Sequence, residues 1–281
     1  MELINDQIHA PAFQKLSDYI WMENWANDYE NSVIKNHNPK LKPINRGNFN
    51  NADMKSGVIF VGMCHILEDI LHDLPKDGNY IIIHRTNDRP FTQKMVDNKP
   101  ESVKHIYTVD CRGNWEGVTA IPFGVSSIMG EDEILKEVYK EKVKKVNKIF
   151  CRYNVNRDTF HRNESLPFMR NNPLVNFTEE QIGQKDFHRQ TKAHKYTMAL
   201  AGCGADASRQ WSSMILGSIP IVTDCPEMRQ FSDMPLLFCP PFEELNKKWL
   251  SLQSIEGKST SRLKMSYWEL HLKEMRLRHG I

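Results

Sequence analysis

The segment spanning residues 196–222 combines two apolar runs, a glycine-containing turn and polar side chains that can bind an anion; it reads YTMALAGCGADASRQWSSMILGSIPIV. The apolar runs at its ends predict strands, and the residues between them predict a helix that begins at Asp206 or Ser208, both good N-cap residues. Gly217 suits the C′ position after that helix. Such a strand–loop–helix unit presents free N–H groups of the helix start at the carboxyl edge of the sheet, where phosphate groups bind.

Arg209 lies in the first turn of this predicted helix. At about 100° per residue, Arg209, Ser212 and Ser213 share one face, whereas Trp211 and the apolar residues after it lie on the opposite face. A guanidinium beside the helix start can neutralise a diphosphate and stabilise it as a leaving group. The residues alone leave open an alternative of equal weight, in which Arg209 forms an ordinary surface ion pair.

The surrounding sequence alternates between apolar runs and amphipathic segments. The predicted strands span residues 58–61, 80–83, 105–109, 118–121, 148–153, 196–200, 219–222 and 235–238. The predicted helices span residues 12–29, 66–71, 131–145, 206–216, 242–252 and 261–278, with a helix and a loop between 157 and 172. This alternation indicates parallel sheets covered by helices on both faces. Because it restarts near residue 146, we expect two α/β domains.

The composition is that of a globular protein. Of 281 residues, 40% are hydrophobic and 26% are charged, which excludes a disordered, collagen-like or coiled-coil chain. The net charge of +2 disfavours nucleic acid as a purely electrostatic partner. No apolar run reaches the roughly 18 residues of a membrane span, and the first residues do not resemble a signal peptide, so we expect a cytoplasmic protein. The six cysteines contain no Cys-x-x-Cys pair, which argues against a metal site or a disulfide framework.

Three runs in the second half of the chain resemble a known enzyme family. They are G-x-G-A-D-x-S-R-x-W at 202–211, L-G-S-I-P-I-V at 216–222 and F-S-D-M-P-L-L at 231–237. In this order they resemble the carboxyl-terminal domain of exostosin-like and fucosyltransferase-like glycosyltransferases. The resemblance covers residues 196–238 and extends more loosely upstream to 150–154, 121–124 and 84–88.

The resemblance implies a GT-B architecture, an α/β fold in which two Rossmann-like domains with parallel sheets face a cleft. Residues 1–146 are then the acceptor-side domain, residues 147–260 the nucleotide-sugar-binding domain, and residues 261–281 a terminal helix that packs back on the first domain. The implied reaction is inverting, metal-independent transfer of a sugar from a nucleotide-diphosphate sugar to a hydroxyl. The nucleotide sugar is a co-substrate, and no further cofactor or metal is expected.

The family motif also implies roles for individual residues. Arg209 corresponds to the residue that binds the donor diphosphate, and Gly204 and Asp206 form the turn that brings the backbone close to it. The other predicted donor-binding residues are Ser208, Ser212, Ser213, Tyr153 and Asn154. Relatives have Glu where this chain has Ser212, and a hydroxyl lacks the charge-assisted hydrogen bond of a carboxylate. Either donor binding is rearranged, or Glu227 or Glu243 supplies a carboxylate, or the enzyme is weakened.

An inverting transfer needs a general base near the acceptor hydroxyl. Asp88 is the first candidate because it follows a predicted strand and matches the acidic position of the family. His84 is the second candidate, and Asp110, after the strand that ends at Val109, is the third. The alternative for each is a cap or turn residue in a loop. Three neighbours of Asp88 are predicted on the acceptor side: Arg85, Asn87 and Arg89.

The acceptor is the least determined part of this interpretation. A glycan is the default acceptor. The many Asn, Lys and Ile residues and the lack of a predicted membrane anchor favour a microbial or viral origin, with the host cytoplasm as the location in the viral case. This makes modified DNA an alternative acceptor, in which a hydroxymethylated base is flipped out of the duplex before transfer. A further alternative, suggested by Ser212, is a nucleotide- or glycan-binding module without catalysis.

Overall fold

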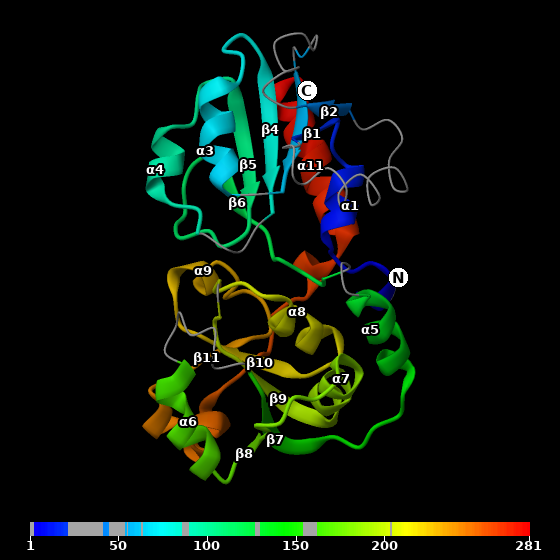
Figure 1. Cartoon of the computed structure of the whole chain (residues 1–281), viewed down its shortest axis with the longest axis vertical. Coiled ribbons are helices and arrows are strands. Elements are labelled where there is room, and N and C mark those ends of the chain that lie inside the picture. The colour runs from blue at the N-terminus through cyan, green and yellow to red at the C-terminus, as the bar shows by residue number, and fades with distance from the viewer. Residues whose placement is uncertain are drawn as a thin grey trace. The chain divides into compact units, whose positions relative to one another are not determined.

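The computed structural model describes residues 3–21, 42–44, 54, 56–62, 64–85, 90–126, 130–153, 162–202 and 204–281. The chain divides into two compact units (Figure 1). The six-strand unit comprises Ile8–Phe123 with Lys264–Ile281, and the five-strand unit comprises Met1–Gln7 with Gly124–Leu263. The predicted α/β class with two parallel sheets is confirmed.

The six-strand unit is built on a parallel sheet in the order β2-β1-β3-β4-β5-β6. Its strands are β1 (Tyr19–Trp21), β2 (Lys42–Ile44), β3 (Ser56–Val61), β4 (Asn79–His84), β5 (Val103–Thr108) and β6 (Val118–Ala120). The middle strands are continuous apolar runs, such as Tyr80-Ile81-Ile82-Ile83, because both of their faces are buried. Helices α3 (Cys64–Asp73) and α4 (Gln93–Asp97) lie on one side of the sheet, and α1 (Ala10–Lys15) and α11 (Met265–His279) lie on the other (Figure 1).

The terminal helix α11 is fixed to the six-strand unit by aromatic and polar contacts. The Trp268 ring packs 6.3 Å from the Phe13 ring of α1. The Tyr107 hydroxyl of β5 hydrogen-bonds His271 Nδ1 at 2.7 Å. Near the end of the helix, Arg276 Nη2 forms an ion pair with Asp18 at 2.8 Å. These contacts join α11 to α1, to strand β5 and to the loop between α1 and β1.

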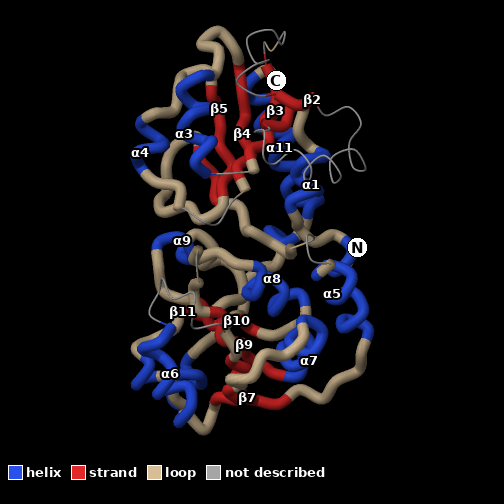
Figure 2. The backbone as a smooth tube through the Cα atoms, viewed as in Figure 1, coloured by secondary structure: helices blue, strands red, loops and turns tan. Residues whose placement is uncertain are grey.

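The five-strand unit has a parallel sheet in the order β11-β10-β9-β7-β8. Its strands are β7 (Val146–Cys151), β8 (Val175–Phe177), β9 (His194–Ala199), β10 (Ile219–Val222) and β11 (Leu237–Phe238). Its α-helices are α5 (Glu131–Lys140), α6 (Arg162–Asn171), α7 (Gln184–Ala193), α8 (Ser208–Ile215), α9 (Pro226–Arg229) and α10 (Lys247–Leu252). Its 3-10 helices are η1 (Leu3–Asn5), η3 (Phe242–Glu244) and η4 (Ser261–Leu263). Figure 2 shows α6 on one side of this sheet and α7 and α8 on the other.

Both sheets have the same topology. In each, the strand that comes first in the chain lies between the second and the third, and the later strands follow in order. This is the flavodoxin-like version of the doubly wound fold. The connection direction reverses between β1 and β3 in one sheet and between β7 and β9 in the other. Ligands of such sheets bind outside the carboxyl ends of the strands at this reversal, so we expect a ligand site at that edge.

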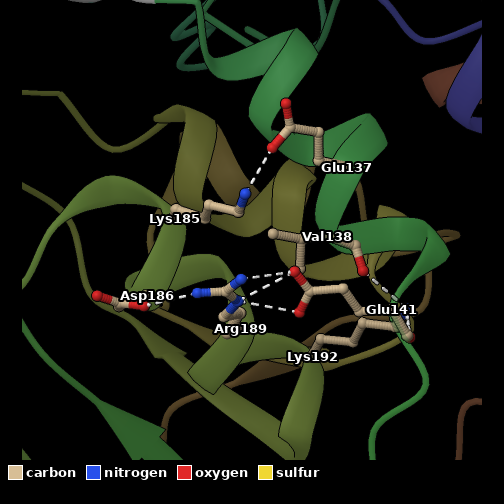
Figure 3. Close-up of polar contacts among 7 residues, drawn as sticks. All are labelled: Glu137, Val138, Glu141, Lys185, Asp186, Arg189 and Lys192. Atoms are coloured by element: carbon tan, nitrogen blue, oxygen red, sulfur yellow. Dashed lines mark hydrogen bonds and ion pairs between the residues drawn. The ribbon is translucent and has the colours of Figure 1, made fainter.

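Helix α5 belongs to the five-strand unit, whereas the sequence prediction assigned residues up to 146 to the first domain. Figure 3 shows the polar contacts between α5 and α7 that hold it. Glu137 pairs with Lys185 at 2.6 Å, and Glu141 pairs with Arg189 at 2.9 Å. Lys192 Nζ donates to three backbone carbonyls at the end of α5. A charged helix face that reads as solvated in sequence therefore binds a neighbouring helix.

The helix predicted over residues 12–29 is confirmed at residues 12–15 and wrong at residues 19–21. Residues 10–15 are helical, but Tyr19, Ile20 and Trp21 form strand β1, which pairs with both β2 and β3. A run of three apolar residues fits a helix and a strand equally well, and pairing in the sheet decides between them. Residues 22–29 lie outside the described part of the chain. The helix predicted over 242–252 is interrupted at Leu245, which separates η3 from α10.

Candidate functional site

The carboxyl edge of the five-strand sheet is shaped by a buried arginine from α6. Arg162 Nε donates to the carbonyl of Ala201 at 2.7 Å, and Nη2 donates to the carbonyl of Leu200 at 2.8 Å. Both carbonyls follow the end of β9. A Cβ atom on Gly202 would lie 2.6 Å from Arg162 Nη2, so a larger residue there would displace the guanidinium. Arg162 therefore fixes the path of the chain from β9 towards α8.

Arg162 is also connected to β7, the other strand at the reversal point. Its guanidinium lies 5.4 Å from the centre of the Tyr153 ring, which follows β7. The Tyr153 and Ser165 hydroxyls share a hydrogen bond, and Ser165 Oγ also donates to the carbonyl of Arg162 at 2.7 Å. Burial raises the pKa of Tyr153 above its usual value. Tyr153 thus supports the arginine that shapes the site. Asn154, which was also predicted to bind the donor, lies outside the described residues.

Asp206 has a structural role that differs from the predicted one. It does not cap helix α8, because the N-cap residue is Ala207 and no side chain accepts a capping hydrogen bond there. Instead the fully buried Asp206 carboxylate accepts a hydrogen bond of 2.5 Å from Trp211 Nε1. Trp211 itself is buried and packs edge-on against Phe231 at 5.0 Å. The carboxylate holds the loop to the buried face of the helix.

The end of α8 confirms the predicted role of Gly217. Its φ is +73°, in the left-handed region that favours glycine. Its N–H donates to Met214 O at 3.0 Å, and the Ser218 N–H donates to Ser213 O at 2.8 Å. These two bonds make the Schellman motif that satisfies the last carbonyls of a helix. The next residues enter β10 directly.

Arg209 remains available at this edge. Its side chain is partly buried, and its guanidinium lies 5.7 Å from the centre of the Phe187 ring of α7. Among the described residues, no carboxylate lies within ion-pair distance of it. Burial, together with the nearby charges of Arg162 and Arg152, lowers the pKa of Arg209 to about 10. The group is still charged at neutral pH, and no carboxylate of the described ranges serves as its counter-ion, which is the environment of an anion-binding arginine.

The serines expected beside Arg209 do not form a polar surface. Ser212 and Ser213 are fully buried, and both hydroxyls donate to the carbonyl of Arg209, at 3.2 and 2.7 Å. The second half of α8 is buried on all sides, so these two hydroxyls, which were predicted to bind the donor, are not exposed. Ser208, at the start of the helix, stays partly exposed, and Gly204 lies in the turn before it, also partly exposed.

The residues predicted as alternatives to the missing glutamate do not lie together. Glu227 is buried in the first turn of α9. Glu243 is exposed in η3 and lines a pocket with Phe168 of α6.

At the carboxyl edge of the six-strand sheet, the described candidates are buried. His84 ends β4 with no exposed surface, and its Nδ1 lies 2.8 Å from Thr108 Oγ1. Because that hydroxyl donates to Val109 O at 3.0 Å, Nδ1 carries the ring proton and Nε2 is a bare acceptor. Burial lowers the pKa of His84 to about 3, so the ring is neutral at physiological pH. In this arrangement His84 cannot touch a ligand.

Two further residues of this edge are held inside the unit. The Arg85 guanidinium lies 5.2 Å from the Phe13 ring and 5.3 Å from the Phe123 ring. Asp110 is 3% exposed and has a φ of +47°, which an aspartate tolerates better than most residues. Three other candidates, Asp88, Asn87 and Arg89, lie outside the described residues.

Arg162 is the structural residue that the sequence analysis missed. It lies in a stretch that was predicted only as a helix and a loop, although it begins the helix after β7 at the reversal point of the sheet. Arg162 and Gly202, which lie close together, are 40 residues apart in sequence, so no local sequence pattern predicts their contact.

A scan against protein-family models finds no match, and a search of curated proteins also finds none. Across the described ranges, no group of three or more His, Cys, Asp or Glu residues is placed to hold a metal ion. No helix within those ranges is long and apolar enough to cross a bilayer.

Proposed function

We propose that this chain is a glycosyltransferase of the GT-B type, which moves a sugar from a nucleotide-diphosphate sugar to a hydroxyl acceptor. The donor diphosphate binds at the carboxyl edge of the five-strand sheet, beside Arg209. The acceptor is a glycan, and the transfer is inverting and independent of metal. The matching topology of the two sheets and the motif around α8 support this proposal.

The observation that carries the proposal is the unneutralised charge of Arg209. A partly buried cation near two further arginines is unfavourable without an anion, and no carboxylate among the described residues supplies one. A diphosphate carries the missing charge. Its oxygens also suit the free N–H groups in the first turn of α8, at the edge where ligands of doubly wound sheets bind.

The proposed chemistry assigns the leaving group to Arg209. The acceptor hydroxyl loses its proton to a general base, for which Asp88 remains our candidate, and its oxygen attacks the anomeric carbon. The bond between that carbon and the β-phosphate oxygen breaks, and the nucleoside diphosphate leaves with one additional negative charge. Arg209 stabilises this charge, so its contribution is larger in the transition state than with bound donor.

The test is a thermal-shift screen of the purified chain with UDP, GDP, CMP, ADP and TDP. A ligand at about 100 times its Kd stabilises the folded state by about 2.7 kcal/mol, which raises the melting temperature measurably. We expect one nucleotide to stabilise the wild type and to have no effect on Arg209→Gln. Arg189→Gln is the matched control, because Arg189 is an exposed arginine that already pairs with Glu141. If no nucleotide stabilises the wild type, the proposal is wrong.

A second candidate function is nucleotide binding without transfer. It is favoured by the burial of Ser212, because the residue at the position of the family's glutamate cannot reach a ligand. The two candidates differ in turnover. Release of free sugar from the matching nucleotide sugar, lost in Arg209→Gln, supports the transferase, whereas nucleotide binding without any hydrolysis or transfer supports the binding module.

A further inference from the structure

A pocket of about 560 Å³ opens on the surface of the five-strand unit, between the exposed side of α6 and the segment that contains η3 and the start of α10. Its floor is formed by Leu174 and Leu245, which are buried. None of the residues at the proposed diphosphate site lines it. Its volume is within the range of small-ligand sites, which is roughly 300–1,000 Å³.

Two phenylalanines form the apolar wall of this pocket. The Phe168 and Phe242 rings have centroids 5.8 Å apart and planes inclined by 32°. Phe168 is one of the few large apolar side chains that are exposed, at 36%. Both residues line the pocket, so their rings offer it aromatic surface. Such a surface suits a ligand with a flat apolar face.

Polar groups with unused hydrogen-bonding capacity surround these rings. Glu243 and Lys247 are exposed, and within the described part of the chain neither has an ion-pair partner. Asn171 uses its Nδ2 to donate to Pro167 O at 2.8 Å, which leaves its Oδ1 as an acceptor. Asn246 uses its Oδ1 to cap α10, which leaves its Nδ2 as a donor. The rim therefore offers both donors and acceptors.

The walls of the pocket are fixed to each other by Asn172. Its Nδ2 donates to the carbonyl of Leu245 at 2.7 Å, and its Oδ1 accepts from the N–H of Leu174 at 3.0 Å. These bonds join the loop after α6 to the loop after η3 across 73 residues of sequence. The pocket is thus preformed, and a ligand that binds there does not have to order its walls.

We propose that this pocket binds a saccharide. A pyranose ring has an apolar face of C–H groups, which can stack on the Phe168 and Phe242 rings, and hydroxyls that both donate and accept hydrogen bonds. The carboxylate, ammonium and amide groups of the rim match this mixed pattern. An apolar peptide segment would cover the rings but leave the rim groups desolvated without partners, which costs free energy. This proposal does not depend on donor binding at Arg209, because the two sites share no residue.

The experiment uses the full chain on a printed array of glycans, followed by titration of the best-bound oligosaccharide with observation by NMR. The informative variants change Phe168, which is exposed enough to be replaced without loss of folding. Phe168→Tyr keeps an aromatic face and should retain binding. Phe168→Leu keeps the apolar character but removes the flat face, and affinity should fall on the order of tenfold. Glu243→Gln should weaken binding less, because the amide still accepts hydrogen bonds.

The results separate this proposal from its competitors. Equal binding by Phe168→Leu and the wild type, or no glycan bound on the array, overturns it. Retention of an apolar peptide but of no saccharide identifies a protein-docking groove instead. Arg209→Gln is the control for the proposed function: it should lose the nucleotide and keep the saccharide. A chain that binds saccharide but no nucleotide would therefore refute the transferase proposal and leave this one standing.

Discussion

The two sheets have the same topology, but the charged residues at their carboxyl edges differ in how far they are buried. In the six-strand unit, His84 is fully buried beside Thr108, and Arg85 lies close to two phenylalanine rings. In the five-strand unit, Arg209 is partly exposed, and no carboxylate in the described ranges neutralises it. The comparison teaches that position at a carboxyl edge does not make a residue available for binding. The difference that the structure shows is exposure: His84 and Arg85 are buried, whereas Arg209 is partly exposed.

Two arginines of the five-strand unit, the buried Arg162 and the partly exposed Arg209, show the same contrast at short range. Arg162 donates to two backbone carbonyls, so its guanidinium is used to hold the chain and not to bind a ligand. The Arg209 guanidinium lies over the Phe187 ring, which attracts a cation but leaves its N–H groups able to donate. Arg162 therefore fixes the path of the loop between β9 and α8. Arg209 is left to bind a ligand beside that loop.

The largest expected effect is that of removing the fixed arginine. Arg162→Ala leaves the carbonyls of Leu200 and Ala201 buried without donors, and we expect a loss of about 3 kcal/mol in the free energy of unfolding. Urea denaturation measures it. Arg170→Ala is the control, because that exposed arginine of the same helix pairs only with Glu179 and should hardly matter.

Gly202→Ala probes the same contact from the opposite side. The added Cβ would meet Arg162 Nη2 at 2.6 Å and displace a guanidinium that two hydrogen bonds hold in place. Because both changes break one contact, the double variant should lose less stability than the sum of the single variants. Full additivity would show that Arg162 does not fix this loop.

The second effect concerns the buried histidine of the other edge. Burial lowers the pKa of His84 from 6.5 to about 3, so the unfolded chain binds the proton more readily between these values. Stability is therefore highest above pH 6.5 and falls as the pH decreases, by about 2 kcal/mol from this group at pH 5. His84→Asn keeps a donor towards Thr108 but does not titrate. Its free energy of unfolding should fall less between pH 8 and pH 5; equal slopes in the two proteins would contradict the assignment.

The sequence predicted the strands around the site better than the contacts within it. The described predicted strands recur with shifted ends, because apolar runs that are buried on both faces have few alternatives. Gly217 was predictable from its local role at the end of a helix. The burial of Ser212 was not predictable. Helical periodicity shows which residues share a face of α8, but it does not show that both faces are buried in the folded unit. Arg162 was missed because its carbonyl partners lie 38 and 39 residues away.

A third effect tests backbone strain at the six-strand edge. Asp110 has a φ of +47°, which asparagine also tolerates but alanine does not. Both Asp110→Asn and Asp110→Ala remove the charge, and their difference contains the backbone strain together with any hydrogen bond that the asparagine side chain keeps. We expect the alanine variant to be less stable than the asparagine variant by about 1 kcal/mol, measured by urea denaturation. Equal stabilities would mean that the backbone at this position relaxes without cost.

The smallest effect concerns the aromatic support of Arg209. Phe187→Leu keeps an apolar side chain on α7 but removes the ring face beneath the guanidinium, and a partly exposed cation–π contact contributes about 1 kcal/mol. Without the ring, Arg209 adopts more orientations, and fewer of them point towards a bound diphosphate. Affinity for the nucleotide found in the thermal-shift screen should fall by about fivefold. Phe187→Tyr, which retains the ring face, should bind like the wild type. If the leucine and tyrosine variants bind equally well, the arginine is positioned by the α8 backbone alone, and the difference between the two edges lies in charge pairing rather than in aromatic support.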